Sequence, residues 1–270
     1  MGKVIAVSNQ KGGVGKTTMT VNVGKNLAGM GYKVLLIDND PQGNLTRAIL
    51  GDGIPSMVVS YSENQDGIVG GANTHVMYEE DAILSPVIVS ENLSIMGASK
   101  HLSAITSKPF DVIFEFKDNL MGLKKDFDYI LIDCLPSFGV LQTAAHMSAN
   151  YLVIPTHLDG FSIDGITEQM KTAIRTKKRL NKELIFLGIA VNGASGGRVN
   201  VEGHHYGTLL EIYGELLFET QITKSSKVEE SHAKMLSLKE YKKHSDQARQ
   251  FQQLTNEIIE RIDGGFGCGQ

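Results

Sequence analysis

The residues best suited to chemistry lie in the segment NQKGGVGKTT, residues 9–18. Its glycines allow the backbone to turn N–H groups toward an anion, and a helix that begins near Lys16 adds partial positive charge at its amino end. At the end of such a loop, a lysine reaches phosphate oxygens and the hydroxyl of a following threonine ligates Mg²⁺. The segment therefore predicts a nucleotide-binding loop rather than a glycine-rich turn without a ligand. The nucleotide-binding residues predicted here are Gly12, Gly13, Val14, Gly15, Lys16, Thr17 and Thr18.

The loop departs from the general phosphate-loop pattern at two positions. The pattern G-x-x-x-x-G-K-[ST] has its first glycine where this chain has Gln10, and a second lysine, Lys11, lies inside the loop. Lys16 already occupies the place of the phosphate-binding lysine. The loop therefore contains one cation more than phosphate binding requires.

Three carboxylates follow apolar runs that read as strands. Asp38 and Asp40 belong to IDNDPQGN, residues 37–44, and Asp133 ends YILIDC, which resembles a Walker B strand. Ligands of open α/β sheets bind at the carboxyl ends of the strands, so these side chains are expected at one edge. Each motif alone could be a helix cap or a solvated turn. Beside a phosphate loop, they predict one carboxylate that orients an attacking water and others that support Mg²⁺.

The elements that must position these residues are strands and helices in alternation. Apolar runs rich in β-branched residues predict strands at 3–8, 33–38, 93–98, 129–134, 151–156, 184–192 and 215–220. Runs that are apolar on both faces suit the interior of a parallel sheet. Residues 163–174 place apolar side chains at helical spacing. We expect an α/β fold with a doubly wound, mostly parallel sheet and helices on both faces.

The same pattern favours a single domain over residues 1–263. Turn-forming residues break the periodicity between 50 and 93, which predicts an irregular excursion with a short helix or two. The glycine-rich residues 264–270 are expected to form a flexible tail.

The composition is that of an ordinary globular protein, with 41% hydrophobic and 21% charged residues among 270. A net charge of −4 means that any nucleic-acid contact needs a local basic patch. The two cysteines, Cys134 and Cys268, are too few for a disulfide framework or a tetrahedral metal site. Neither a signal region nor a long apolar stretch is visible, so we expect a cytoplasmic protein.

Several motifs together resemble the ParA/MinD family of deviant Walker A ATPases, and most closely its ParA/Soj branch. They are KGGVGKT (11–17), DNDPQGN (38–44), ENLSIMGASKHLSA (91–104), DYILIDCLPSFG (128–139) and VIPTHLDGFSIDG (153–165). They cover roughly the first two-thirds of the chain. The resemblance implies a P-loop NTPase fold of the deviant Walker A type, with ATP and Mg²⁺ as cofactors.

The resemblance also implies a role for the extra lysine. In the family, two subunits sandwich two ATP molecules, and each subunit's signature lysine, here Lys11, reaches the phosphates bound by its partner. Such a cation makes dimerisation depend on ATP rather than ADP. The implied catalytic residues are Lys11, Lys16 and Asp40, of which Asp40 positions the attacking water. The implied magnesium shell comprises Thr17, Asp38 and Asp133.

Two positions depart from the family pattern in the sheet region. Leu135 replaces the first of two prolines after Cys134, which predicts a small change in the switch loop and no loss of function. Asn192 resembles an adenine-contacting asparagine of other branches of the family. An asparagine that caps a strand end is the alternative for Asn192.

The family's non-specific DNA contacts map onto residues near the carboxyl end. Where the family has Ile-Pro-Arg and a second arginine, this chain has Lys224 and Lys227, and lysine can also contact phosphates. Nearby Glu229 and Glu230 dilute the charge, so solvated surface charges are the alternative. A second basic run, residues 171–182, is either another DNA candidate or a complement to a helix dipole. The DNA-binding candidates are Arg198, Lys224, Lys227, Lys242 and Lys243.

The resemblance implies a partition ATPase that forms a homodimer on ATP, coats the nucleoid through non-specific DNA binding and is stimulated by a ParB-like protein. The cargo could be a plasmid, a chromosome origin or a protein assembly. A MinD-like regulator that binds membranes through an amphipathic carboxyl-terminal helix is the alternative, and residues 241–262 predict such a helix. The tail beyond Ile262 lacks the bulky apolar and basic residues of a membrane anchor, so no membrane is expected. An electron-transfer ATPase would need cluster-binding cysteines, and neither Cys134 nor Cys268 is placed like those ligands.

Overall fold

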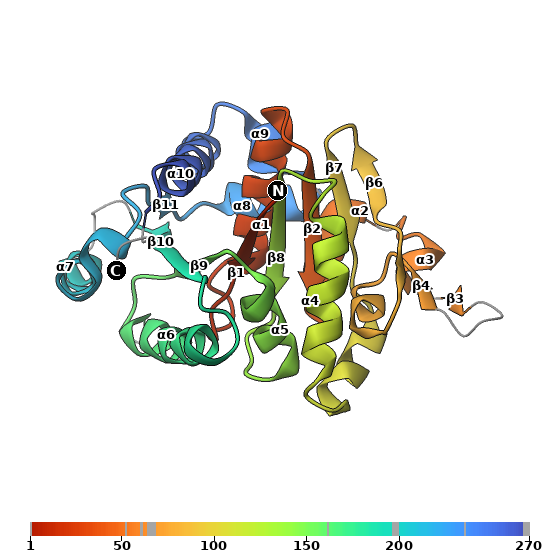
Figure 1. Ribbon diagram of the computed structural model, residues 1–270. Coiled ribbons are helices and arrows are strands. Elements are labelled where there is room, and N and C mark those ends of the chain that lie inside the picture. The colour runs from red at the N-terminus through yellow and green to blue at the C-terminus, as the bar shows by residue number, and fades with distance from the viewer. Residues whose placement is uncertain are drawn as a thin grey trace.

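The computed structural model describes residues 2–51, 53–59, 62–63, 69–160, 162–195, 200–234 and 236–266. A twisted sheet of eight strands lies between two layers of helices (Figure 1). This arrangement confirms the expected α/β fold with helices on both faces.

The strands of the main sheet run in the order β11-β10-β9-β1-β8-β2-β7-β6. Every pair is parallel except β6 with β7, which is antiparallel. The strands are β1 (Lys3–Val7), β2 (Val34–Asn39), β6 (Val87–Ser90), β7 (Leu93–Met96), β8 (Tyr129–Cys134), β9 (Tyr151–Thr156), β10 (Ile185–Ala194) and β11 (Ile222–Thr223). The first strand thus lies near the centre, between β8 and β9.

Side chains of β1 alternate between two cores because successive residues of a strand point to opposite faces. Val4 and Ala6 join the core under α4 (Val112–Leu123), α5 (Val140–Ser148) and α6 (Ser162–Arg179). Ile5 and Val7 join the core under α1 (Lys16–Gly29) and α10 (Asp246–Asp263). The central strands are therefore covered on both faces, which explains their unbroken apolar runs.

One predicted strand is wrong. Residues 215–220 were expected to form a strand, but Gly214–Leu216 form the short 3₁₀ helix η3 and Leu217 makes a single bridge to Ile189. Leu217 and Phe218 are buried all the same. Their apolar side chains belong to a loop that packs into the core. The edge strand β11 begins four residues after Phe218.

The carboxyl-terminal helix is interrupted where the sequence pattern predicts a continuous one over 241–262. The helix α9 (Leu238–Lys242) ends, and Ser245 begins α10 by accepting a hydrogen bond from the Ala248 N–H at 3.2 Å. Phe251, Leu254 and Ile258 are buried against the sheet and α1. The apolar face of α10 therefore packs on the core. Among the described residues, no helix combines the length and apolarity that crossing a membrane requires.

The excursion between 50 and 93 contains more regular structure than expected. It holds α3 (Ser56–Val59), the 3₁₀ helix η1 (Thr74–Tyr78) and a small sheet of β3 (Ser62–Glu63), β4 (Val69–Gly71) and β5 (Ile83–Leu84). It also supplies β6, which forms one edge of the main sheet and leaves Ile88 79% exposed. The remaining helices of the described chain are α2 (Asn44–Leu50), η2 (Lys100–Ser107), α7 (Asn200–Tyr213) and α8 (Ser226–Ala233).

Candidate nucleotide-binding site

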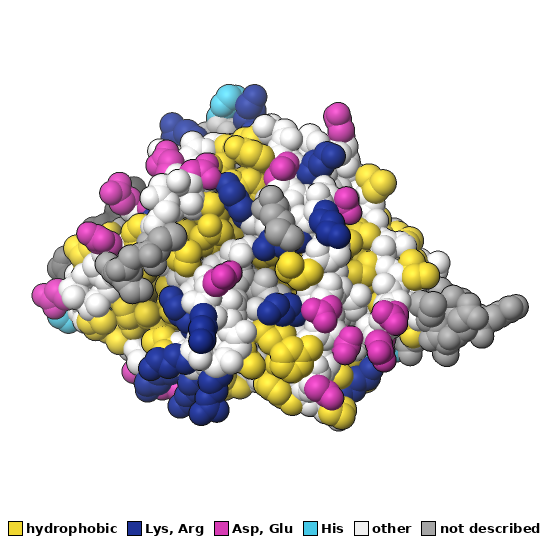
Figure 2. Space-filling model, viewed as in Figure 1, with side chains coloured by type: hydrophobic (Ala, Val, Ile, Leu, Met, Phe, Trp, Pro, Cys, Tyr) yellow, Lys and Arg dark blue, Asp and Glu magenta, His cyan; other side chains and the backbone are white. Residues whose placement is uncertain are grey.

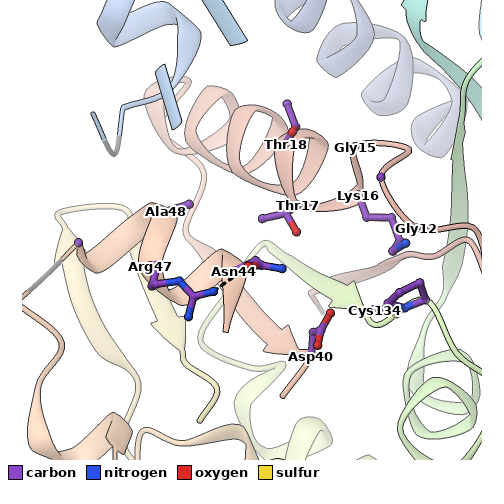
Figure 3. A pocket seen from close by; sticks show the side chains of 13 residues that line it. Gly12, Gly15, Lys16, Thr17, Thr18, Asp40, Asn44, Arg47, Ala48 and Cys134 are labelled. Atoms are coloured by element: carbon purple, nitrogen blue, oxygen red, sulfur yellow. Dashed lines mark hydrogen bonds between the residues drawn. The ribbon is translucent and has the colours of Figure 1, made fainter. Parts of the chain in front are cut away.

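A cavity of about 500 Å³ opens between the loop before α1 and the carboxyl ends of β2 and β8. Figure 3 shows Lys16, Thr17 and Asp40 on this cavity. The described residues that line it are Gly12, Gly13, Gly15, Lys16, Thr17, Thr18, Asp40, Asn44, Arg47, Ala48, Gly51, Cys134 and Pro136. The phosphate loop and one of the predicted carboxylates thus meet in one place.

The loop takes its shape from glycines in left-handed backbone conformations. Gly13 has φ 74° and Gly15 has φ 88°, backbone conformations that residues other than glycine rarely adopt. A Cβ atom at Gly15 would also lie 2.0 Å from the amide nitrogen of Asn192. Gly15 begins α1 without a side-chain cap, so the first N–H groups of this helix are available to an anion.

Lys16 lies folded into the loop. Its side chain is buried, and Nζ donates a hydrogen bond to the carbonyl oxygen of Lys11 at 3.0 Å. Burial lowers the pKa of Lys16, while the neighbouring charge of Asp133 opposes that shift. A buried ammonium gains from an anionic partner, because the low-dielectric surroundings strengthen the attraction.

Thr17 and Asp133 form the best candidate for a magnesium site. The Thr17 hydroxyl donates to Oδ2 of Asp133 at 2.6 Å, whereas Oδ1 of Asp133 is buried without a hydrogen-bond partner in the described structure. Burial, aided by the nearby Asp38, raises the pKa of Asp133 to about 8. Mg²⁺ would displace the proton of Asp133, and the unsatisfied carboxylate oxygen beside the Thr17 hydroxyl is a suitable oxygen donor set for it. Mg²⁺ commonly takes only one or two protein carboxylates together with phosphates and water.

Asp38 lies beside Asp133 across the β2–β8 pair, but its oxygens have other partners. Its Oδ2 accepts from the backbone N–H and the hydroxyl of Thr46, at 2.8 and 2.7 Å, and Oδ1 accepts from the Asp40 N–H at 3.3 Å. Burial raises the pKa of Asp38 to about 6. Asp38 thus joins β2 to α2, a contact that the sequence pattern did not reveal, and its place in a magnesium shell stays a prediction.

Asp40 is half-buried at the end of β2 and lines the cavity. Its Oδ1 accepts from the Gln42 N–H at 2.9 Å, which fixes the carboxylate within its own turn. A carboxylate in this position can orient a water molecule toward a phosphate held by the loop.

Lys11 and Gln10 turn away from the cavity toward α6. The Lys11 ammonium forms an ion pair with Asp159, and Lys11 is absent from the described residues that line the cavity. The Gln10 amide donates to the Thr172 hydroxyl at 3.2 Å. The two residues that depart from the general phosphate-loop pattern therefore connect the loop to α6 and to the segment before it.

Asn192 packs against the loop rather than capping its strand. Its Nδ2 donates to the carbonyl oxygen of Val14 at 3.0 Å. Asn192 thus contacts the loop directly but is not among the described residues that line the cavity, and the adenine contact stays a prediction.

Sequence reasoning missed Arg47, which lines the cavity from α2. Its guanidinium donates to Oδ1 of Asn44 at 2.8 Å (Figure 3). Because Asn44 ends the motif DNDPQGN and begins a helix, a residue three positions later falls on the same helical face. That spacing was the available signal.

The described DNA-binding candidates belong to different elements, and two of them lie near carboxylates. Lys224 follows β11 and lies in the field of Glu202, and Lys242 lies in the field of Glu230. Lys227 belongs to α8, and Lys243 follows α9. Arg198 lies outside the described residues.

Comparisons with known proteins agree with this geometry. A family model described as an AAA domain matches residues 2–186. The sporulation initiation inhibitor protein Soj of Bacillus subtilis is 30% identical over 96% of this chain and 98% of its own length. The chromosome-partitioning ATPase Soj of Treponema pallidum is 30% identical over 97% of this chain and 98% of its own length.

A solved structure shares the fold over nearly the whole chain. It is cobyrinic acid a,c-diamide synthase from Mycobacterium smegmatis with a bound ATP analogue and magnesium. The TM-score is 0.78 at 24% identity, with 99% of this chain and 98% of that chain covered.

Proposed function

Because the chain belongs to the ParA/MinD family of P-loop ATPases, we propose that it is a partition-type ATPase. It would dimerise on ATP, bind DNA without sequence preference and hydrolyse ATP when a ParB-like protein stimulates it. Support comes from near full-length similarity to two Soj proteins, one of them named as a chromosome-partitioning ATPase.

The groups in and beside the cavity are suited to ATP hydrolysis. The glycine loop and Lys16 would bind the phosphates, and Thr17 with Asp133 would hold Mg²⁺. Bound Mg²⁺ neutralises charge on the phosphate oxygens. Asp40 would orient the water that attacks the terminal phosphorus as the bond to ADP breaks. The solved structure with an ATP analogue and magnesium supports this choice of ligands on the same fold.

The position of Lys11 is the observation that carries the dimer proposal. Its ion pair with Asp159 lies beside the loop, and Lys11 does not belong to the described lining of its own cavity. A lysine in this place is suited to reach the phosphates of a second subunit. Such a contact would require the terminal phosphate and would couple dimerisation to ATP.

Binding of the Asp40→Ala protein to random-sequence duplex DNA, with ATP and with ADP over a range of salt, tests the proposal. We expect ATP-dependent binding that weakens steeply with salt, because phosphate contacts release counterions. Lys16→Ala is the matched control and should lose both nucleotide binding and DNA binding. If ATP drives dimerisation while DNA is ignored, the ATPase remains and the partition role on DNA is wrong.

A further inference from the structure

The outer side of α6 carries a concentration of cations unusual for a chain of net charge −4. No carboxylate occurs between residues 171 and 182. Figure 2 shows Lys and Arg side chains gathered over α6. We call the following exposed set the α6 basic face: Lys171, Arg175, Lys178, Arg179 and Lys182.

Helical spacing places the four members that belong to α6 on one side of the helix, and Lys182 follows just beyond its end. Lys171, Arg175 and Lys178 follow one another at intervals of four and three residues, which are neighbours on a helix surface. The opposite side is fixed by buried Ile166 and Ala173. From residue 171 to 179 the helix advances roughly 12 Å, at about 1.5 Å per residue. The face is therefore a rigid row of charges.

Most of this charge has no ion-pair partner among the residues that the structure describes. Lys171 pairs with Glu168 across the surface, with side chains 56% and 51% exposed, and such pairs contribute little. No ion pair to a described carboxylate is found for Arg175, Lys178, Arg179 or Lys182.

Two alternatives explain the face less well. A helix dipole favours cations in the last turn, which accounts for Lys178 and Arg179 but not for Lys171 and Arg175 one to two turns earlier. The carboxyl-terminal candidates have weaker fields because Glu202 lies near Lys224 and Glu230 lies near Lys242. Cations that pair with no described carboxylate attract polyanions, and duplex DNA is a polyanion of high charge density.

We propose that the α6 basic face is the surface that contacts the DNA phosphates. This inference rests on the proposed DNA-binding function and assigns that function to a surface other than the carboxyl-terminal lysines. The contacts are phosphate contacts, because a row of Lys and Arg on a helix exterior presents charge without a pattern that reads bases.

The position of α6 also connects this face to the nucleotide. Thr172, next to Lys171, accepts the hydrogen bond from Gln10 of the phosphate loop at 3.2 Å. Asp159, just before α6, holds Lys11. A change in the loop on ATP binding would act directly on the helix that carries the face.

The test compares two neutralised variants in the Asp40→Ala protein with ATP. One carries Arg175→Gln, Lys178→Gln and Arg179→Gln, and its matched control carries Lys224→Gln, Lys227→Gln and Lys242→Gln. We expect the affinity of the α6 variant for random duplex DNA to fall at least about tenfold. The slope of log affinity against log salt should shrink by about 0.9 for each phosphate that the variant no longer neutralises. The control should keep most of the affinity and slope.

Each other outcome has a definite meaning. An α6 variant that binds like the parent, or a weakening confined to the control variant, overturns the assignment. Absence of DNA binding by the parent itself contradicts the proposed function, which separates the two failures. Binding to phosphatidylserine vesicles but not to DNA, abolished in the α6 variant, would assign the face to lipid and also overturn the proposal. ATP-dependent dimerisation of both variants serves as the folding control, since the substituted α6 side chains are exposed.

Discussion

At the scale of single residues, the proposed dimer would give Lys11 a second partner. In the single chain it pairs with Asp159, while the proposed dimer requires it at the phosphates of the other subunit. Dimerisation would then have to break the ion pair. The pair is partly exposed, at 28% and 41%, so its contribution is about 1 kcal/mol or less.

Replacement of Asp159 by asparagine should therefore favour the dimer. We expect Asp159→Asn to reach half-maximal dimerisation at an ATP concentration up to about fivefold lower, the ratio that corresponds to about 1 kcal/mol. Analytical ultracentrifugation across an ATP titration measures this ratio. Asp164→Asn, which removes an exposed carboxylate nearby on α6, is the control. A higher ATP requirement in Asp159→Asn would mean that Asp159 supports the dimer instead.

Much of the site could be predicted from residue types. The loop glycines, Lys16, Thr17 and Asp40 could be predicted because local structure sets their positions. The glycines form a turn, Lys16 and Thr17 begin a helix, and Asp40 follows the end of a strand. The hydrogen bond between Asp38 and Thr46 was missed because the two residues are eight positions apart in sequence. They come into contact only when α2 packs beside the end of β2. Such a contact leaves no periodic signal.

At the scale of elements, the strands that could be predicted are those in the part of the sheet that helices cover on both faces. The runs that became β1, β2, β8 and β9 are apolar apart from polar residues near their ends, because helices cover both sides of the sheet. The wrong strand at 215–220 was equally apolar but lies in a connection. The strands β3 to β5 were missed because pieces of two or three residues carry almost no pattern of their own.

The packing of α10 yields a prediction at this scale. Phe251 is 1% exposed in the core against α1 and the sheet. Phe251→Ala should lower the free energy of unfolding by about 3–5 kcal/mol, because the packing of the ring is removed and a residual cavity remains. Urea unfolding measures the change, with exposed Gln253→Ala as the control.

The same variant separates core packing from a membrane role for α10. If the apolar face of α10 bound lipid, Phe251→Ala would weaken vesicle binding and leave the stability nearly unchanged. Such a result would contradict the packing seen here and return the MinD-like alternative to consideration.

At the scale of the whole molecule, one buried histidine links stability to pH. His146 is fully buried on α5, and its Nε2 lies 3.2 Å from the amide nitrogen of Gln169. Burial lowers the pKa of His146 from 6.5 to about 4. The unfolded chain therefore takes up a proton between pH 6.5 and pH 4 that the folded chain does not, so stability falls as pH falls through this window.

Substitution of His146 by glutamine should remove this component of the pH dependence. Between pH 6.5 and pH 4 the parent should lose about 3 kcal/mol more than His146→Gln, since one pKa unit corresponds to about 1.4 kcal/mol. Urea unfolding of both proteins at several pH values gives the difference, from which the contributions of the shared carboxylates cancel. A constant difference between the two proteins would show that His146 does not titrate as described.

The edge strand β6 has a consequence for how the protein behaves in concentrated solution. Its sequence VIVS contains no charge or proline, and Ile88 is 79% exposed at the rim of the main sheet. Charged residues and proline often protect the edge strands of natural sheets, because the unpaired N–H and C=O groups of an edge strand can pair with another chain. Here the protection comes from the four-residue length of β6 and from the register shift in its pairing with β7, between Ile88 and Ser90. At high protein concentration these two features limit pairing of the edge with another chain, although Ile88 stays exposed.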